Sequence, residues 1–197
     1  MKNSEKLLNV VRDVMAQWPC VDLKNRHVFL RNLVFMHRVI VASEPLLEEA
    51  MTHAKGALRD YLAEHLEEER CHDEWVAEDL ASAGIDVAGC QFPSEAVAAA
   101  GTQYYLIRHV DPCALLGYMA VLECFPMPLE QLSMLEEIHG IQLCRTLRHH
   151  AEHDVGHGAD LLAQVDSLTD RQLALVMQNA VQTAIYIGSA ISKFEVQ

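Results

Sequence analysis

The chain has 197 residues, 51% of them hydrophobic, which is enough to bury a core within one domain covering residues 1–197. Its net charge of −13 comes from 28 acidic and 15 basic residues spread along the chain, which argues against nucleic acid or an anionic membrane as partner. No apolar run reaches 18 residues, and the first residues do not resemble a signal peptide, so we expect a cytoplasmic location.

Apolar residues recur at spacings of three and four along almost the whole chain, and no stretch alternates with period two for long enough to predict a sheet. The predicted fold class is therefore all-α. Proline, glycine and N-cap residues mark the expected helix ends, with Asp111 and Thr169 among the caps. In chain order, the expected helices cover about residues 4–18, 24–42, 43–56, 57–83, 94–110, 112–123 and 129–139, then a helix after Gly140 to about 165, and 169–194.

Six cysteines are scattered through the chain without a C-x-x-C pair, so a zinc ribbon and a thioredoxin-like motif are absent. Because free cysteines favour buried positions, we expect reduced, mostly buried thiols. The six are Cys20, Cys71, Cys90, Cys113, Cys124 and Cys144.

A doubled histidine frame, H-x-x-x-[DE]-x-x-H, is the most informative motif. Residues at positions i, i+4 and i+7 of a helix lie on one face. With 11 His and 28 acidic residues in the chain, about 0.08 copies are expected by chance. Two copies therefore predict one metal site between two helices. The copies are His65-Glu69-His72 and His150-Asp154-His157.

Carboxylates and imidazoles on facing helices of a bundle hold paired iron or manganese ions. Glu123 ends the apolar run CALLGYMAVLEC, where an unpaired carboxylate would be costly, and is a further candidate ligand. The alternative for Glu123 is a helix end that faces water, and for the two frames it is a solvated acidic face. His65 could equally be a partner of a ligand or an exposed residue. The remaining histidines are expected on the surface or without a role: His27, His53, His109, His139, His149 and His153.

Three elements follow one another along the chain: Glu69-x-x-His72, Glu123 in a VLE segment, and the second frame. With these elements in this order, the chain resembles the haem-oxygenase-like di-iron oxidases, an iron-containing redox enzyme family. The resemblance covers nearly the whole chain and implies the fold of thiaminase II (TenA) and pyrroloquinoline-quinone synthase, a bundle of about seven to eight helices. It implies two Fe²⁺ ions, for which manganese can substitute, and O₂ as co-substrate. Glu69 would bridge the ions, and Glu69 and Glu123 would act in catalysis. The implied metal ligands are Glu69, His72, Glu123, His150, Asp154 and His157.

One position departs from the family pattern. The family usually supplies another glutamate about 30 residues before E-x-x-H, but residues 24–42 contain no carboxylate, and His37 stands at the matching distance. His37 is therefore included as a metal ligand, the alternatives being a packed or exposed histidine, or a carboxylate from residues 44–49. Three carboxylates would then face four positive charges from two divalent ions, so we expect one tight and one weak site without substrate.

Three classes of function fit this pattern. The first is an oxygen-activating di-iron oxidase or oxygenase for a small, carboxylate-bearing substrate, which Arg31, Arg38 or Arg108 could hold. The second is a metal-free thiaminase-like hydrolase with Cys71 or Cys124 as nucleophile, or a cofactorless oxidase. The third is a binding or regulatory protein that keeps the scaffold. Two complete frames favour the first class, and the sequence leaves a homodimer open.

Overall fold

The computed structural model describes residues 1–193, apart from the side chain of Val155, and within this part of the chain every regular element is a helix. The all-α prediction is confirmed. The α-helices are α1 (Asn3–Met15), α2 (Arg26–Ile40), α3 (Ser43–His53), α4 (Ala57–Glu68), α5 (His72–Ser82), α6 (Ser94–His109), α7 (Leu115–Glu123), α8 (Leu129–His139), α9 (Arg145–Asp166) and α10 (Asp170–Ser192). Three short 3₁₀-helices join them: η1 (Val87–Gly89), η2 (Pro112–Ala114) and η3 (Ile141–Leu143).

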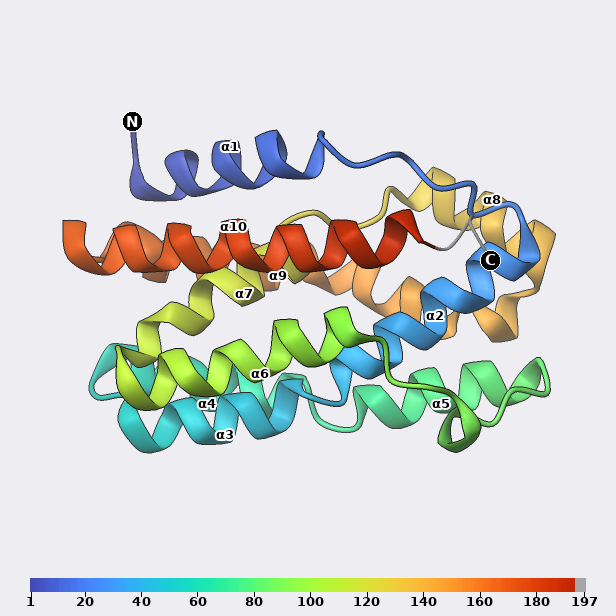
Figure 1. The fold of residues 1–197 in the computed structure, drawn as a ribbon, viewed down its shortest axis with the longest axis horizontal. Coiled ribbons are helices and arrows are strands. Elements are labelled where there is room, and N and C mark those ends of the chain that lie inside the picture. Colours follow the sequence, from blue (N-terminus) through green and yellow to red (C-terminus); the bar gives the residue numbers. More distant parts are fainter. Residues whose placement is uncertain (194–197) are drawn as a thin grey trace.

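The helices form a layered bundle with α10 near its middle (Figure 1). Helix α10 packs against α1, α6 and α7, and α7 also packs against α9. Helices α3, α4 and α6 lie together on one side, while α2 crosses the bundle and packs against α5. This arrangement brings α4, α5, α7 and α9, which carry the predicted ligands, around one region of the interior.

The predicted helix over residues 57–83 is wrong, because the structure divides it into α4 and α5. The break falls at residues 69–71, where Cys71 adopts a left-handed backbone conformation with φ of 63°. The Cys71 backbone N–H donates to Glu44 Oε1 at 2.8 Å, a tertiary contact that holds the turn. No glycine or proline marks this break, so local sequence gave no sign of it. With this split, residues 1–193 contain ten α-helices where the sequence pattern predicts nine, and the family resemblance implied about seven to eight.

Two expected caps are observed at helix starts. Thr169 accepts the backbone N–H of Gln172 and forms a capping box with that residue, and Asp111 accepts the N–H of Cys113. The last predicted helix ends at about Phe194, which lies outside the described residues.

Two clusters of buried apolar side chains stabilise the bundle, and α9 contributes to both. Leu147 and Ala151 belong to one cluster, whereas Leu161 and Val165 belong to the other. The polar stripe of residues 150–157 therefore lies between the two cores, where carboxylates and histidines meet without interrupting either of them.

The prediction of mostly buried thiols is wrong. Within the described residues all six cysteines are free, but only Cys113 and Cys144 are buried, while Cys20 and Cys71 are exposed. Between residues 1 and 193, none of the helices combines the length and apolar character that crossing a bilayer requires.

Candidate metal centre

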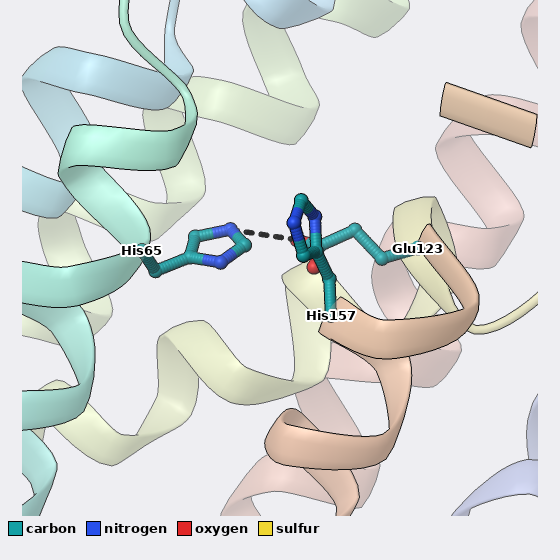
Figure 2. Close-up of side chains that lie close together, drawn as sticks. All are labelled: His65, Glu123 and His157. Carbon is teal, nitrogen blue, oxygen red and sulfur yellow. Dashed lines mark ion pairs between the residues drawn. The ribbon is translucent and has the colours of Figure 1, made fainter. Parts of the chain in front are cut away.

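Two groups of three metal-type donors lie in the interior. Group A consists of Glu69, His72 and His150, and group B of His65, Glu123 and His157. Within each group, one donor atom from every residue lies within 4.8 Å of the others. Figure 2 shows group B, with the ring of His65 directed at the Glu123 carboxylate. The two groups are the arrangement expected of two neighbouring metal sites.

The break between α4 and α5 shapes group A. Glu69 follows the last residue of α4 and His72 opens α5, so the turn between them brings His72 Nδ1 to 3.5 Å from Glu69 Oε2. His150 reaches the same place from α9, with its ring centroid 4.9 Å from that of His72. Glu69 and His72 of the first frame thus remain together, although no continuous helix holds them.

Group B joins three helices. His65 Nε2 on α4 lies 3.2 Å from Glu123 Oε1 at the end of α7, and both side chains are buried. The His157 ring from α9 approaches the His65 ring edge-on, with 5.6 Å between the centroids. Glu123 is therefore buried and partnered, as the sequence argument required, and does not face water.

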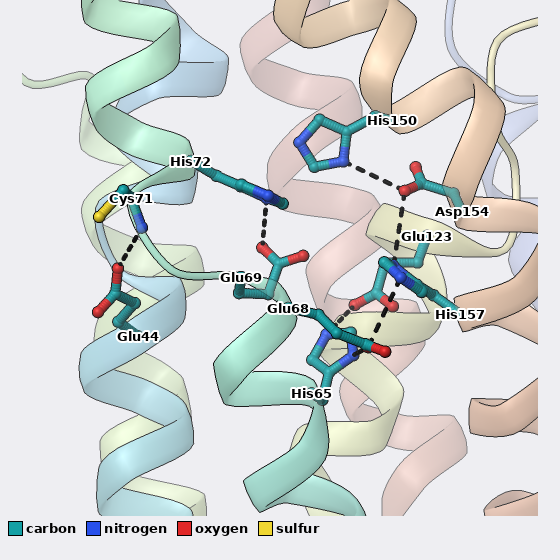
Figure 3. Close-up of polar contacts among 10 residues, drawn as sticks. All are labelled: Glu44, His65, Glu68, Glu69, Cys71, His72, Glu123, His150, Asp154 and His157. Carbon is teal, nitrogen blue, oxygen red and sulfur yellow. Dashed lines mark hydrogen bonds and ion pairs between the residues drawn. The ribbon is translucent and has the colours of Figure 1, made fainter.

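Asp154 lies between the two groups on α9 (Figure 3). Its Oδ1 is 3.1 Å from His150 Nδ1 in group A and 4.0 Å from His157 Nδ1 in group B. A carboxylate in this place fixes the tautomer of His150, whose Nε2 is then left to face the site as an acceptor.

Glu68 is a carboxylate at this site that the sequence analysis did not include. Its Oε2 lies 3.5 Å from His157 Nε2 and 3.6 Å from His65 Nδ1, and its side chain is about half exposed. Its spacing of three residues from His65 is the one sequence signal that could have identified it.

Burial and neighbouring charges shift the pKa values of the carboxylates in opposite directions. Burial raises the pKa of Glu123, although its hydrogen bond with His65 opposes that rise. Burial also acts to raise the pKa of Glu69, but the neighbouring His72 ring, with the charges of His150 and His65, outweighs burial and lowers the pKa. The pKa of His65 is raised, because the hydrogen bond and charge of Glu123 outweigh burial. A raised pKa means that protons compete more strongly with a metal ion for the His65 imidazole.

Unpartnered buried atoms test whether the residues fit metal ions. Both ring nitrogens of His72, His150 Nε2, His157 Nδ1 and Glu123 Oε2 are buried and form no hydrogen bond. Leaving such atoms unpaired costs about 1–3 kcal/mol each. Lone pairs on imidazole and carboxylate that converge in one buried place are what a divalent transition metal needs, so the donor set fits iron.

Five of the seven predicted ligands belong to the two groups, and Asp154 lies between them. His37 is buried on α2 but belongs to neither group, and its ligation stays a prediction. His65 belongs to group B, although the resemblance did not include it among the implied ligands. Among the other histidines, His139 was expected on the surface but is buried, with Nε2 2.8 Å from the Leu23 carbonyl oxygen.

Comparisons with solved structures agree with this fold. A domain of unknown function with a haem-oxygenase-like fold from Shewanella denitrificans superposes with a TM-score of 0.75 at 13% identity, covering 98% of this chain and 87% of that one. A TenA homologue from Pseudomonas syringae pv. tomato gives 0.73 at 11% identity, covering 98% and 92%. The fold is therefore haem-oxygenase-like, as predicted. No curated protein sequence matches this chain.

A helical bundle with two groups of buried histidines and carboxylates is an arrangement that metalloproteins use to hold transition-metal ions. A family described as iron-containing redox enzyme matches residues 28–186. This chain belongs to that family of iron-containing redox enzymes.

Proposed function

We propose that the protein is an oxygen-dependent, non-haem di-iron oxidase or oxygenase that acts on a small organic molecule. The observation that carries the proposal is the pair of three-donor groups, Glu69-His72-His150 and His65-Glu123-His157, with unpartnered nitrogens in both. One group would support a single ion, whereas two adjacent groups with Asp154 between them support a pair.

The charges favour one tight and one weaker site. Glu69, Glu123 and Asp154 supply three negative charges against four from two divalent ions. Glu68 adds a fourth carboxylate at the rim, near the two histidines of group B. Because Glu68 is half exposed, it can turn toward the site or toward water, and group B would be the weaker site.

Bound ferrous ions would supply the electrons that dioxygen accepts. The chain supplies the surroundings of that chemistry. Asp154 orients His150, and the buried position of Glu69 and Glu123 keeps water from the donors. Manganese satisfies the same oxygen and nitrogen donors, so both metals belong in any loading experiment.

The cysteine alternatives have less support. Burial, with the charges of Glu123 and Asp154, raises the pKa of Cys124 to about 12, which leaves almost no thiolate at neutral pH. The Cys71 pKa is also raised, chiefly by Glu74, and Figure 3 shows its sulfur directed away from the histidines. A thiaminase-like nucleophile would need the opposite environment.

Anaerobic titration tests the proposal. Metal-free protein is titrated with Fe²⁺ or Mn²⁺, bound metal is counted by elemental analysis, and the iron-loaded protein is then exposed to air-saturated buffer in an oxygen electrode. We expect two equivalents of iron, bound in a tight and a weaker step, and oxygen uptake that depends on the iron. Binding of one equivalent or fewer, or iron-loaded protein without oxygen uptake, would overturn the di-iron proposal.

A further inference from the structure

A cavity of about 320 Å³ adjoins the donor groups. At one end it is lined by Glu69, Glu123, His150 and Asp154, from both sides of the candidate centre. Away from that end its walls come mainly from α2, α10 and the segment after α7. A largely apolar cavity with polar groups converging at one end is the usual form of a small-molecule site.

Beyond the metal donors, the lining is almost entirely apolar. Met36, Val39 and Ile40 line it from α2, and Ile187 and Ile191 from α10. Asn32 and Ser43 are its further polar residues, and no lysine or arginine appears among the described residues that line it. A charged group on a substrate therefore meets a charged partner only at the carboxylate and histidine end.

The three arginines suggested by the sequence lie elsewhere. Arg38 donates to the Cys90 carbonyl oxygen at 2.8 Å, and Arg108 pairs with Glu49 at 2.8 Å. Arg31 lines a separate surface cleft of about 670 Å³. None of the three lines the cavity, so a substrate with a charged group at the end of its chain away from the donors meets no counter-charge there.

On the basis of the proposed function, we infer that the substrate class is a flexible aliphatic molecule with a single polar head group. The head group lies at the donor end and the chain extends along the α2 and α10 walls. A cavity of about 320 Å³ has room for about ten non-hydrogen atoms, taking about 30 Å³ for each as for liquid water. Met36 suits this role, because a thioether side chain adapts to a flexible ligand.

Phe35 separates the two cavities, since it contributes to the lining of both the inner cavity and the surface cleft. This shared wall supplies a matched control. Leu30 lies on the same helix as Met36 but lines only the surface cleft. Filling one cavity or the other with tryptophan therefore distinguishes where an aliphatic ligand binds.

Calorimetric titration of Mn²⁺-loaded protein tests the inference without turnover. The probes are 1-hexanol, 1-octanol and 1-decanol, decanoate and decylamine. L-lysine is the comparison, because its side chain ends in an ammonium group that would lie against the apolar walls. Each added methylene is expected to tighten binding about four-fold until the chain fills the cavity. Met36→Trp should weaken the binding of the best ten-carbon probe at least ten-fold, while Leu30→Trp keeps it. Ile191→Trp, from the opposite wall, should act like Met36→Trp, and circular dichroism confirms that each variant is folded.

Affinity that does not depend on chain length, tighter binding of lysine than of the aliphatic probes, or equal losses in Leu30→Trp and Met36→Trp would overturn the inference. Metal content is measured on the same samples. Two bound metal ions with no binding of aliphatic probes contradict the substrate class alone, whereas absence of metal binding contradicts the proposed function.

Discussion

His65 and Glu123 meet in the protein interior, with 3.2 Å between His65 Nε2 and Glu123 Oε1, and this contact joins α4 to α7. Neither residue lies in the E-x-x-H element, yet together with His157 they form one of the two donor groups. The contact makes His65 a proposed metal ligand. This role would explain why His65 stands at the same spacing from Glu69 and His72 as His150 does from Asp154 and His157.

Replacement of His65 should therefore remove one of the two metals. His65→Gln keeps a polar side chain but lacks the imidazole donor, so anaerobic Fe²⁺ titration should show one equivalent instead of two, with the tight step retained. His53→Gln is the control, because His53 is exposed and pairs with Glu49 outside the site. Two full equivalents in His65→Gln would remove His65 from the ligand set.

Glu69 is the proposed bridge between the two ions. In Glu69→Ala both sites should lose metal, since group A loses a ligand and group B loses the shared carboxylate charge. Glu67→Ala is the matched control two residues earlier, where the exposed Glu67 pairs with Arg70. Elemental analysis after gel filtration measures the outcome, and unchanged occupancy of one site in Glu69→Ala would show that Glu69 does not bridge.

The residue types and the periodic pattern were enough to predict an all-α bundle and most of the donor set. They could not predict the turn at residues 69–71, because Cys71 is held in its left-handed conformation by Glu44, a residue from another helix. They could not rank His65 above a surface histidine, since its ring lies against Glu123 and His157, which come from helices distant in the sequence. The cavity beside the site is formed by helices far apart in the sequence, so its apolar character was not predictable either.

Asp79 connects α5, which carries His72, to the start of α9, which carries the second frame. Its carboxylate is buried and accepts from Arg145 Nε at 2.7 Å and from the Thr146 backbone N–H at 2.9 Å. Asp79→Ala leaves these donors unpaired and should lower the free energy of unfolding by about 3 kcal/mol. Urea denaturation measures this change. The exposed neighbour Glu78, which also pairs with Arg145, gives the comparison, since Glu78→Gln should cost no more than about 0.5 kcal/mol.

The ion pair between Glu49 on α3 and Arg108 on α6 should make stability depend on pH. Hydrogen bonds from Arg108 and His53 lower the pKa of Glu49 to about 2. A lowered pKa in the folded state contributes stability that is present above the ordinary glutamate pKa and is lost as the pH falls towards 2. Wild type should therefore be more stable than Glu49→Gln at pH 7, and urea denaturation should show this difference disappearing by about pH 2.

Glu48→Gln, one residue earlier on the same helix and exposed, is the control for the removal of a charge alone. A difference between wild type and Glu49→Gln that stays constant over the whole pH range would contradict the assignment of this ion pair.

Gly117 on α7 allows the close approach of α10 that positions Glu123 at the end of α7. A Cβ atom at Gly117 would lie 2.2 Å from the Val176 carbonyl oxygen and 2.9 Å from the Ala180 nitrogen, both backbone atoms that side-chain rotation cannot relieve. Gly117→Ala should therefore destabilise the protein by about 3 kcal/mol or more, because the two helices must move apart. Gly101→Ala on α6 is the matched control, since its Cβ would meet nothing within 4 Å and alanine favours the helix, giving a gain of about 0.5–1 kcal/mol. Thermal and urea denaturation measure the stability of both variants. Equal effects of the two substitutions would mean that α7 and α10 do not pack as closely as described.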